Sequence, residues 1–142
     1  MIKDDKGQIS LEYLLIFAIS MAILIVFTLP LTEQSLEDTL DVSSSLDVKN
    51  DLSKITQAIE KVYGEGQGSK QTVNIISQNK VIIYITDNHI FCKLKLKSGS
   101  YKTIDDYYES NLATCSITLN KGENILVVEW PENSDKMVIY EE

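Results

Sequence analysis

The spacing of hydrophobic and polar residues changes twice along this chain. Residues 13–29 include no charged residue, and their apolar side chains would occupy every side of a helix. Residues 33–62 place apolar residues three or four apart, between acids, lysines and serines. From residue 70 onward, apolar and polar residues largely alternate. The three patterns predict an apolar helix, an amphipathic helix and a β-rich domain, which is an α+β fold.

The apolar segment is long enough to cross a membrane. As a helix, residues 8–31 would extend roughly 36 Å, more than the hydrocarbon core of a bilayer. A helix that is apolar all round is buried in lipid or among similar helices. A cleaved secretory signal has a shorter apolar region and a small-residue cleavage site, which residues 28–32 do not supply. We expect the helix to be retained, with the leader inside the cell and the acidic flank outside.

Pro30 permits two interpretations. It lacks a backbone donor and disfavours helix at Leu29, so it can kink or locally melt one continuous helix. It can equally mark the point where one helix ends and a second begins with proline in its first turn.

The amphipathic segment carries one apolar stripe, which lapses at the serines of residues 43–45. Glycines 64, 66 and 68 are expected to end the helix. We expect the stripe to cover the dry face of a sheet. Its residues are Leu36, Leu40, Val48, Leu52, Ile55, Ile59 and Val62.

Seven strands are predicted in the C-terminal half of the chain. Short polar gaps between them favour hairpins and one small antiparallel sheet. Alternation in residues 91–97 gives one lysine-bearing face and one dry face. The predicted strands are residues 72–77, 80–86, 89–96, 101–104, 114–119, 123–130 and 137–141.

Charge argues against nucleic-acid binding. The formal net charge is −8, and all 13 basic residues are lysines scattered along the chain. Nucleic-acid binding needs a dense basic patch. Catalytic signatures are missing too, because the chain has a single histidine and no catalytic, phosphate-binding or dinucleotide-binding motif. We therefore expect no enzyme activity and no cofactor.

The two cysteines could form a disulfide, or they could bind a metal together with the histidine. His89, Cys92 and Cys115 could supply three ligands, but a fourth ligand and a paired Cys-x-x-Cys motif are missing. A disulfide between Cys92 and Cys115 is expected if this half lies outside the cell, and buried thiols if it lies inside.

A group of three acids is a candidate cation site. Asp105, Asp106 and Glu109 cluster in a stretch that the pattern predicts to be irregular. They could bind a divalent cation or form an adhesive patch, but a solvated loop is the simpler expectation.

The junction between leader and helix carries the most specific signal. The sequence Gly7-Gln8-Ile9-Ser10-Leu11-Glu12-Tyr13 resembles the class III signal peptide of archaeal type IV pilin-like proteins, best known from methanogens. The resemblance covers residues 1–32. It implies that a membrane-embedded prepilin peptidase cuts after Lys6-Gly7, before Gln8, on the cytoplasmic side. The leader of this chain is shorter and less basic than is usual in the family.

The same resemblance gives roles to the residues after the cut. Gln8, Ser10 and Glu12 belong to the retained motif, and Glu12 becomes the fifth residue of the mature chain. A carboxylate within a membrane helix is costly and usually marks a pairing site. The resemblance implies that Glu12 pairs with the new α-amino group at Gln8 of an adjacent subunit. The alternative is that Glu12 is an interfacial acid in an ordinary signal-anchored protein.

The resulting organisation is a cleaved leader (residues 1–7), a transmembrane and filament-core helix (8–32), an amphipathic helix (33–63) and a β-rich head (70–142), as in a pilin-like lollipop. We expect a self-polymerising subunit of an archaeal pilus-like filament used for adhesion. Its partners would be the prepilin peptidase, an assembly ATPase and a membrane platform protein. The precursor would reside in the cytoplasmic membrane and the product in an extracellular filament. Alternatives are a membrane-anchored extracellular binding module and a minor or secretion-type pilin.

Overall fold

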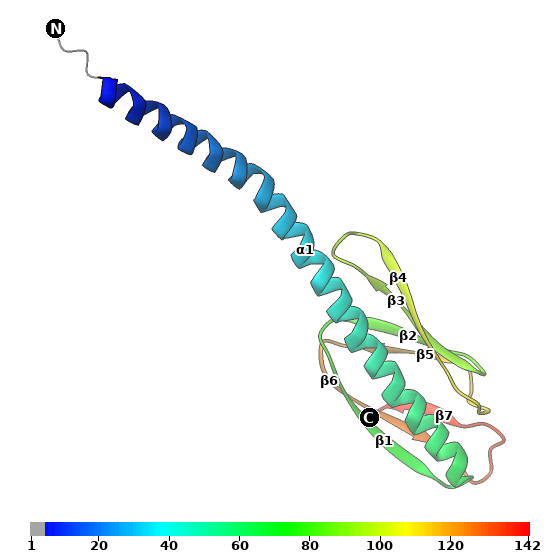
Figure 1. Ribbon diagram of the computed structural model, residues 1–142. Coiled ribbons are helices and arrows are strands. Elements are labelled where there is room, and N and C mark those ends of the chain that lie inside the picture. The colour runs from blue at the N-terminus through cyan, green and yellow to red at the C-terminus, as the bar shows by residue number, and fades with distance from the viewer. Residues whose placement is uncertain (1–4) are drawn as a thin grey trace. The chain divides into compact units, whose positions relative to one another are not determined.

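The computed structural model describes the backbone of residues 5–142 and the side-chain surroundings of residues 11–142. In this part of the chain, helix α1 (Asp5–Glu65) is followed by seven strands (Figure 1). The chain divides into two compact units, Met1–Thr39 and Leu40–Glu142. The α+β class predicted from the sequence is confirmed. The strands are β1 (Lys70–Ser77), β2 (Val81–Ile85), β3 (His89–Lys95), β4 (Tyr101–Tyr107), β5 (Cys115–Leu119), β6 (Gly122–Glu129) and β7 (Val138–Glu141).

Helix α1 runs through Pro30 without a break (Figure 1). Proline has no N–H to donate to the carbonyl four residues earlier, so the helix loses one hydrogen bond at this point. The Thr32 hydroxyl donates to the carbonyls of Thr28 and Leu29, at 3.0 and 2.8 Å. The interpretation of Pro30 as a helix end is therefore wrong, and so is local melting. A bend at Pro30 during transfer from membrane to filament stays a prediction.

Helix α1 ends among the glycines that were predicted to end it. The helix stops at Glu65, and the N–H of Gly66 donates to the carbonyl of Val62 at 3.0 Å. Gly66 has a φ of 88°, which is the left-handed conformation that closes helices and that residues with a Cβ adopt at a cost.

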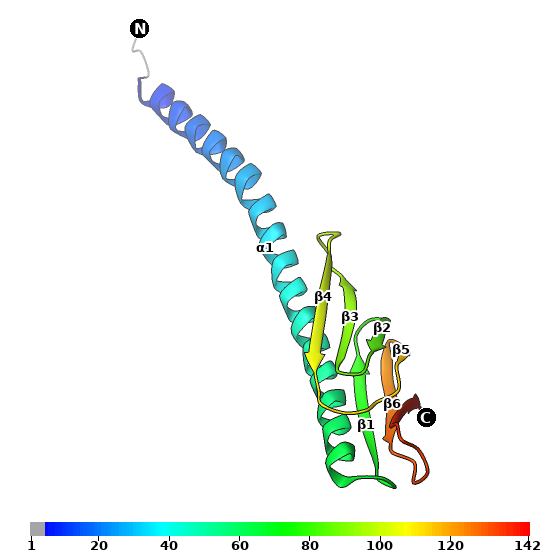
Figure 2. The same ribbon diagram turned by 90° about the vertical axis from the view of Figure 1, so that its right-hand side faces the viewer.

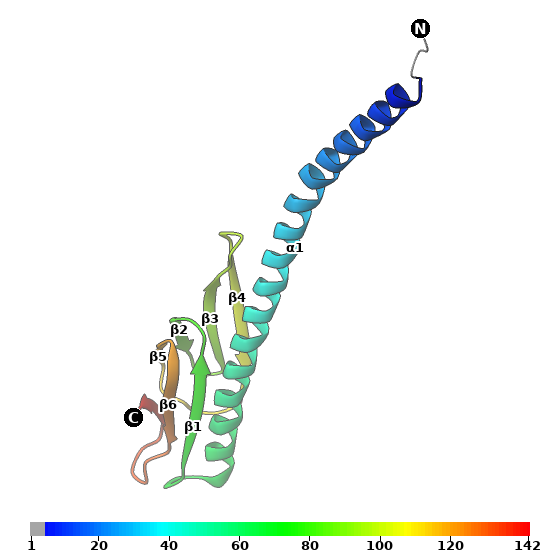
Figure 3. The ribbon, with the colours of Figure 1, turned by 90° about the vertical axis from the view of Figure 1, so that its left-hand side faces the viewer.

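In the second unit, the C-terminal half of α1 covers two antiparallel sheets. One has the order β1-β6-β7 and the other β4-β3-β2-β5. Figures 2 and 3 show both sheets on the same side of this half of the helix. The single sheet predicted from the sequence is wrong, because β1 pairs with β6 rather than with β2, and β1, β6 and β7 form a separate sheet.

The core lies between this half of α1 and the inner faces of the two sheets. Leu52, Ile55, Ile59 and Val62 of the helix are fully buried. At about 1.5–3 kcal/mol for each buried side chain of this size, they are the main attachment of the helix to the sheets. The strands contribute Ile75, Val81, Ile83, Ile85, Ile90, Cys92, Leu94, Ile104, Ile117, Leu119, Leu126, Val128 and Ile139.

The N-terminal end of the apolar stripe on α1 is not where the sequence predicted it. Leu36 and Leu40 are 61% and 36% exposed, so they do not join the core. The positions that face the sheets one and two turns before Val48 are instead Ser45 and Asp41, which are 7% and 9% exposed. Asp41 is followed on the same face at spacings of three and four, as helical periodicity requires. The packing face of the helix therefore begins with polar residues.

Candidate functional site

The N-terminal half of α1 displays an apolar surface with nothing over it. Every large apolar side chain from residue 11 to residue 31 is between 48% and 70% exposed. Contiguous exposed apolar surface of this kind marks a site of interaction with lipid or protein. Its side chains are Leu11, Tyr13, Leu14, Leu15, Ile16, Phe17, Ile19, Met21, Ile23, Leu24, Ile25, Val26, Phe27, Leu29 and Leu31.

Among the described residues, α1 is the one helix whose length and apolar composition suffice to cross a membrane. The most apolar part of the helix lies near its N-terminus and is not buried within the structure. An environment of lipid or of similar helices would satisfy this surface, as the all-round apolar pattern requires.

Glu12 is the one acid within this apolar surface. Its side chain is exposed, and it takes part in none of the ion pairs found in the described part of the chain. A charged carboxylate costs on the order of 2.5–3.5 kcal/mol at the centre of a membrane helix. The geometry leaves the Glu12 carboxylate available to a partner outside the chain.

The predicted cleavage junction lies at the start of the same helix. α1 begins at Asp5, so the backbone on both sides of the Gly7–Gln8 bond is helical. The side chains of Lys6, Gln8 and Ser10 lie outside the described residues, and their predicted contacts stay predictions.

One comparison with known proteins identifies this segment. A family model described as class III signal peptide matches residues 6–31. The chain carries a class III signal peptide. The matched residues span the junction, Glu12 and the exposed apolar surface, and such a leader belongs to type IV pilin-like precursors. Searches of curated proteins and of solved structures found no match.

The class III signal peptide gives the exposed helix a defined context. Leaders of this class are cut by a prepilin peptidase and keep the apolar helix, so an N-terminal membrane anchor fits residues 11–31. The class III signal peptide predicted from residues 7–13 is confirmed.

Beyond the signal peptide, His89 lies on the exposed face of β3. Its ring stacks on Phe91 and Tyr107, with centroids 5.1 and 5.7 Å away. Its Nδ1 is 2.7 Å from the Thr86 hydroxyl. Cys92 is three residues further along the strand, on the opposite, buried face. The structure therefore separates His89 from Cys92, and among the described residues no cluster of potential metal ligands is found.

The structure also corrects the predicted disulfide. Cys92 and Cys115 are free thiols. Cys92 is paired with Ile83 and Cys115 with Ile85, so the two cysteines lie on opposite sides of β2. Two strand spacings come to roughly 9.6 Å, and a disulfide tolerates a Cα separation up to about 6.8 Å. Burial raises the pKa of Cys92 to about 11 and also raises the pKa of Cys115, which makes both thiols poor nucleophiles.

The acidic cluster is not the irregular loop that the sequence predicted. Asp105 and Asp106 are consecutive residues of β4, so their side chains point to opposite faces of the sheet. Asp106 forms an ion pair with Lys49 of α1, with 3.0 Å between Nζ and Oδ1. Glu109 follows the strand and is exposed. The three carboxylates therefore do not converge on one point.

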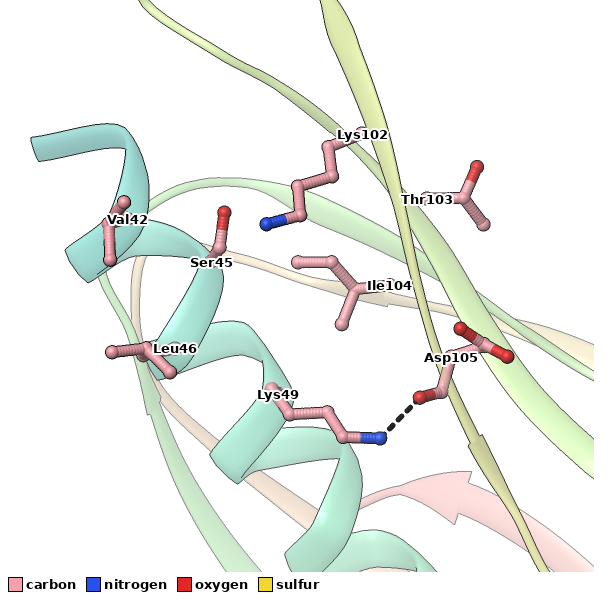
Figure 4. A pocket seen from close by; sticks show the side chains of 8 residues that line it. All are labelled: Val42, Ser45, Leu46, Lys49, Lys102, Thr103, Ile104 and Asp105. Atoms are coloured by element: carbon pink, nitrogen blue, oxygen red, sulfur yellow. Dashed lines mark hydrogen bonds between the residues drawn. The ribbon is translucent and has the colours of Figure 1, made fainter. Parts of the chain in front are cut away.

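A groove of about 280 Å³ lies between α1 and β4 in the second unit. Figure 4 shows Ile104 and Lys102 pointing from β4 toward the helix, where Val42 and Leu46 form the other wall. Lys49 closes one end and donates to the carbonyl of Asp105. Sequence reasoning missed this groove, because it depends on β4 lying beside the helix.

Proposed function

We propose that this chain is the precursor of a structural subunit of an archaeal type IV pilus-like cell-surface filament that serves adhesion. The observation that carries the proposal is the coincidence of a class III signal peptide with an apolar helix surface that is uncovered from residue 11 to residue 31. In this proposal the chain is a structural component and not an enzyme.

The proposed pathway moves the apolar helix between two environments. The precursor lies in the cytoplasmic membrane with its leader inside and its head outside. A prepilin peptidase cuts between Gly7 and Gln8, and an assembly ATPase with a membrane platform protein lifts the mature chain from the bilayer. Apolar contacts among copies of residues 11–31 then replace contacts with lipid. Close packing between helices supplies the stabilisation, since lipid and helix surfaces are similarly apolar.

Glu12 sets the register of each incoming subunit in this proposal. The cut creates an α-amino group at Gln8, four residues before Glu12. In a bundle of parallel helices, the amine of one copy can neutralise the carboxylate of the next. Pairing removes the cost of an isolated charge in apolar surroundings.

The head remains outside the helical core and provides the adhesive surface. It is attached to the second half of α1 through the fully buried Leu52, Ile55, Ile59 and Val62. Such an attachment carries the head into the filament with the second half of α1.

Replacing Glu12 tests the proposal. Glu12→Gln and Glu12→Ala are expected to leave cleavage at Gly7 intact and to reduce sheared surface filaments strongly. Glu65→Gln is the matched control, because Glu65 is an exposed acid at the far end of the same helix. Abundant normal filaments from either Glu12 variant would contradict the proposed role of Glu12.

The assembly state, copy number and location of the processed wild-type chain distinguish the proposal from its alternatives. Processed chains that stay as monomers in the membrane would support an anchored extracellular binding module. Low copy number with location only at filament tips would support a minor or secretion-type pilin.

A further inference from the structure

A cleft of about 470 Å³ in the second unit gathers a large share of the chain's positive charge. It lies where β2 begins and β3 ends, beside α1. Four lysines and three apolar residues are among those that line it. The lining lysines are Lys80, Lys93, Lys95 and Lys97, and the apolar residues are Val81, Leu94 and Leu96.

Strand register explains why these lysines gather. Lys93 and Lys95 lie on the solvent-facing side of β3, and the residues between them point to the buried side. Lys97 follows two positions after Lys95. Ile83 of β2 pairs with Cys92. The pairing stops there, and Lys80 lies just before β2, where it lines the same cleft as Lys95. The lysine cleft therefore forms where β3 ends and β2 begins, from two lysines of β3 and one lysine just outside each strand.

The positive charge of the lysine cleft is not neutralised within the described chain. The ion pairs found there join Lys49 to Asp106, Lys54 to Asp51 and Lys136 to Asp87. Asp41 also lines the cleft, but its carboxylate accepts the backbone N–H groups of Lys97 and Ser98. Four exposed lysines thus line one cleft in a chain whose formal net charge is −8.

A complementary surface lies on α1 directly after the signal peptide. Glu33 and Glu37 are one helical turn apart on the same face, with Leu36 between them. Leu36 is 61% exposed, and both glutamates are exposed. After Lys6, the first lysine of the chain is Lys49, so no basic residue of the helix offsets this acidic face.

We propose that the lysine cleft of one copy binds the Glu33–Leu36–Glu37 face of α1 from a second copy. The glutamates would pair with the lysines that line the cleft. Charge complementarity of this kind fixes register and selects the partner more than it adds affinity. The inference rests on the proposed filament, in which it sets how each head lies on the helix of a neighbour.

Charge reversal tests the contact in the full-length chain, expressed with its assembly machinery. The cleft variant is Lys93→Glu with Lys95→Glu, and the helix variant is Glu33→Lys with Glu37→Lys. Each variant alone is expected to lower the yield of sheared filaments by about tenfold or more, because like charges then face each other between copies. Co-expression of the two variants is expected to restore the yield, since each then meets a partner of opposite charge.

Matched controls separate a specific contact from a general charge effect. Lys61→Glu with Lys121→Glu, and Glu60→Lys with Glu65→Lys, change exposed residues outside the cleft and the helix face. They are expected to keep wild-type yield. Membrane levels and the processed N-terminus of every variant report whether the chain folds and is cut.

Three results would overturn the inference. One is wild-type yield from either variant alone, and another is the absence of rescue in any combination. The third is rescue only when all four substitutions are in one chain, which would place the contact within a single copy. If the wild-type chain itself forms no filaments, the proposed function fails and the inference falls with it.

Discussion

Asp41 of α1 accepts a hydrogen bond from the backbone N–H of Lys97, at 2.7 Å. The N–H of Ser98 lies 3.4 Å from the other carboxylate oxygen. Lys97 and Ser98 lie in the turn between β3 and β4, so the Asp41 carboxylate supplies an acceptor to two N–H groups of this turn. Asp41, at the N-terminal end of the packing face of α1, therefore fixes the β3–β4 turn to the helix.

Asp41→Ala is expected to destabilise the second unit by about 1–3 kcal/mol. The substitution leaves a part-buried N–H without an acceptor, and the penalty for that is of this order. Urea unfolding of the full-length chain in detergent, followed by the fluorescence of Trp130, measures the change. Trp130 is the single tryptophan and stacks on Tyr63 at 5.6 Å, so it reports the junction of helix and sheet.

Asp38→Ala is the control for Asp41. Asp38 lies one turn earlier on the same helix and is exposed. Its replacement is expected to change stability by less than about 0.5 kcal/mol. Equal effects of the two substitutions would contradict the role given to Asp41.

Ile59→Ala is expected to cost about 2–5 kcal/mol, because Ile59 is completely buried between α1 and the sheets. Leu46→Ala removes a similar side chain from the same helix, but Leu46 is 58% exposed and little is lost. Unfolding measurements on the two variants compare the two faces of the helix. A larger loss at Leu46 would show that the helix packs on the sheets by a different face.

Both cysteines are expected to remain thiols in the native chain. Denaturing the protein without reductant and adding a thiol reagent is expected to label both Cys92 and Cys115. Absence of labelling would mean that the strands flanking β2 rearrange to bring the cysteines together.

Alkaline pH is expected to weaken the fold through Cys92. Burial raises the pKa of its thiol from 9.0 to about 11, so the native state favours the neutral form. The stabilisation is complete below pH 9 and is lost as the pH rises from 9 toward 11. Burial also raises the pKa of Tyr108, from 10.0 to about 12, which acts in the same direction at higher pH.

Cys92→Ala isolates the part that Cys92 plays in this pH dependence. The variant is less stable at neutral pH because it opens a cavity, but it has no thiol to ionise. Its stability is expected to fall less steeply than that of the wild type between pH 9 and pH 11. Parallel profiles would contradict the assignment to Cys92.

The elements of the fold were predictable because their signals are local. Alternation located all seven strands, and the glycines located the end of α1. Strand pairing was not predictable in the same way. Residues 78–79 and 120–122 have the composition of hairpin turns, yet each connects two different sheets. Pairing of β1 with β6 depends on contacts across some 50 residues, which no local pattern encodes.

The junction could be predicted because its signal is local, whereas the surfaces of the head depend on residues that are distant in sequence. Gly7 and Glu12 belong to one short, contiguous motif, and the family model confirms it. The lysine cleft and the groove beside β4 combine residues that are distant in sequence. The prediction of the stripe was wrong at Leu36 and Leu40, because it counted only apolar residues as buried. The fold instead places Asp41 and Ser45 against the sheet.

The most direct test of the account is mass spectrometry of the chain recovered from sheared cell-surface filaments. We predict an abundant filament fraction in which the chain begins at Gln8, as the free amine or in the cyclised form. A chain that retains Met1, or whose processed form is recovered only from membranes, would contradict the account.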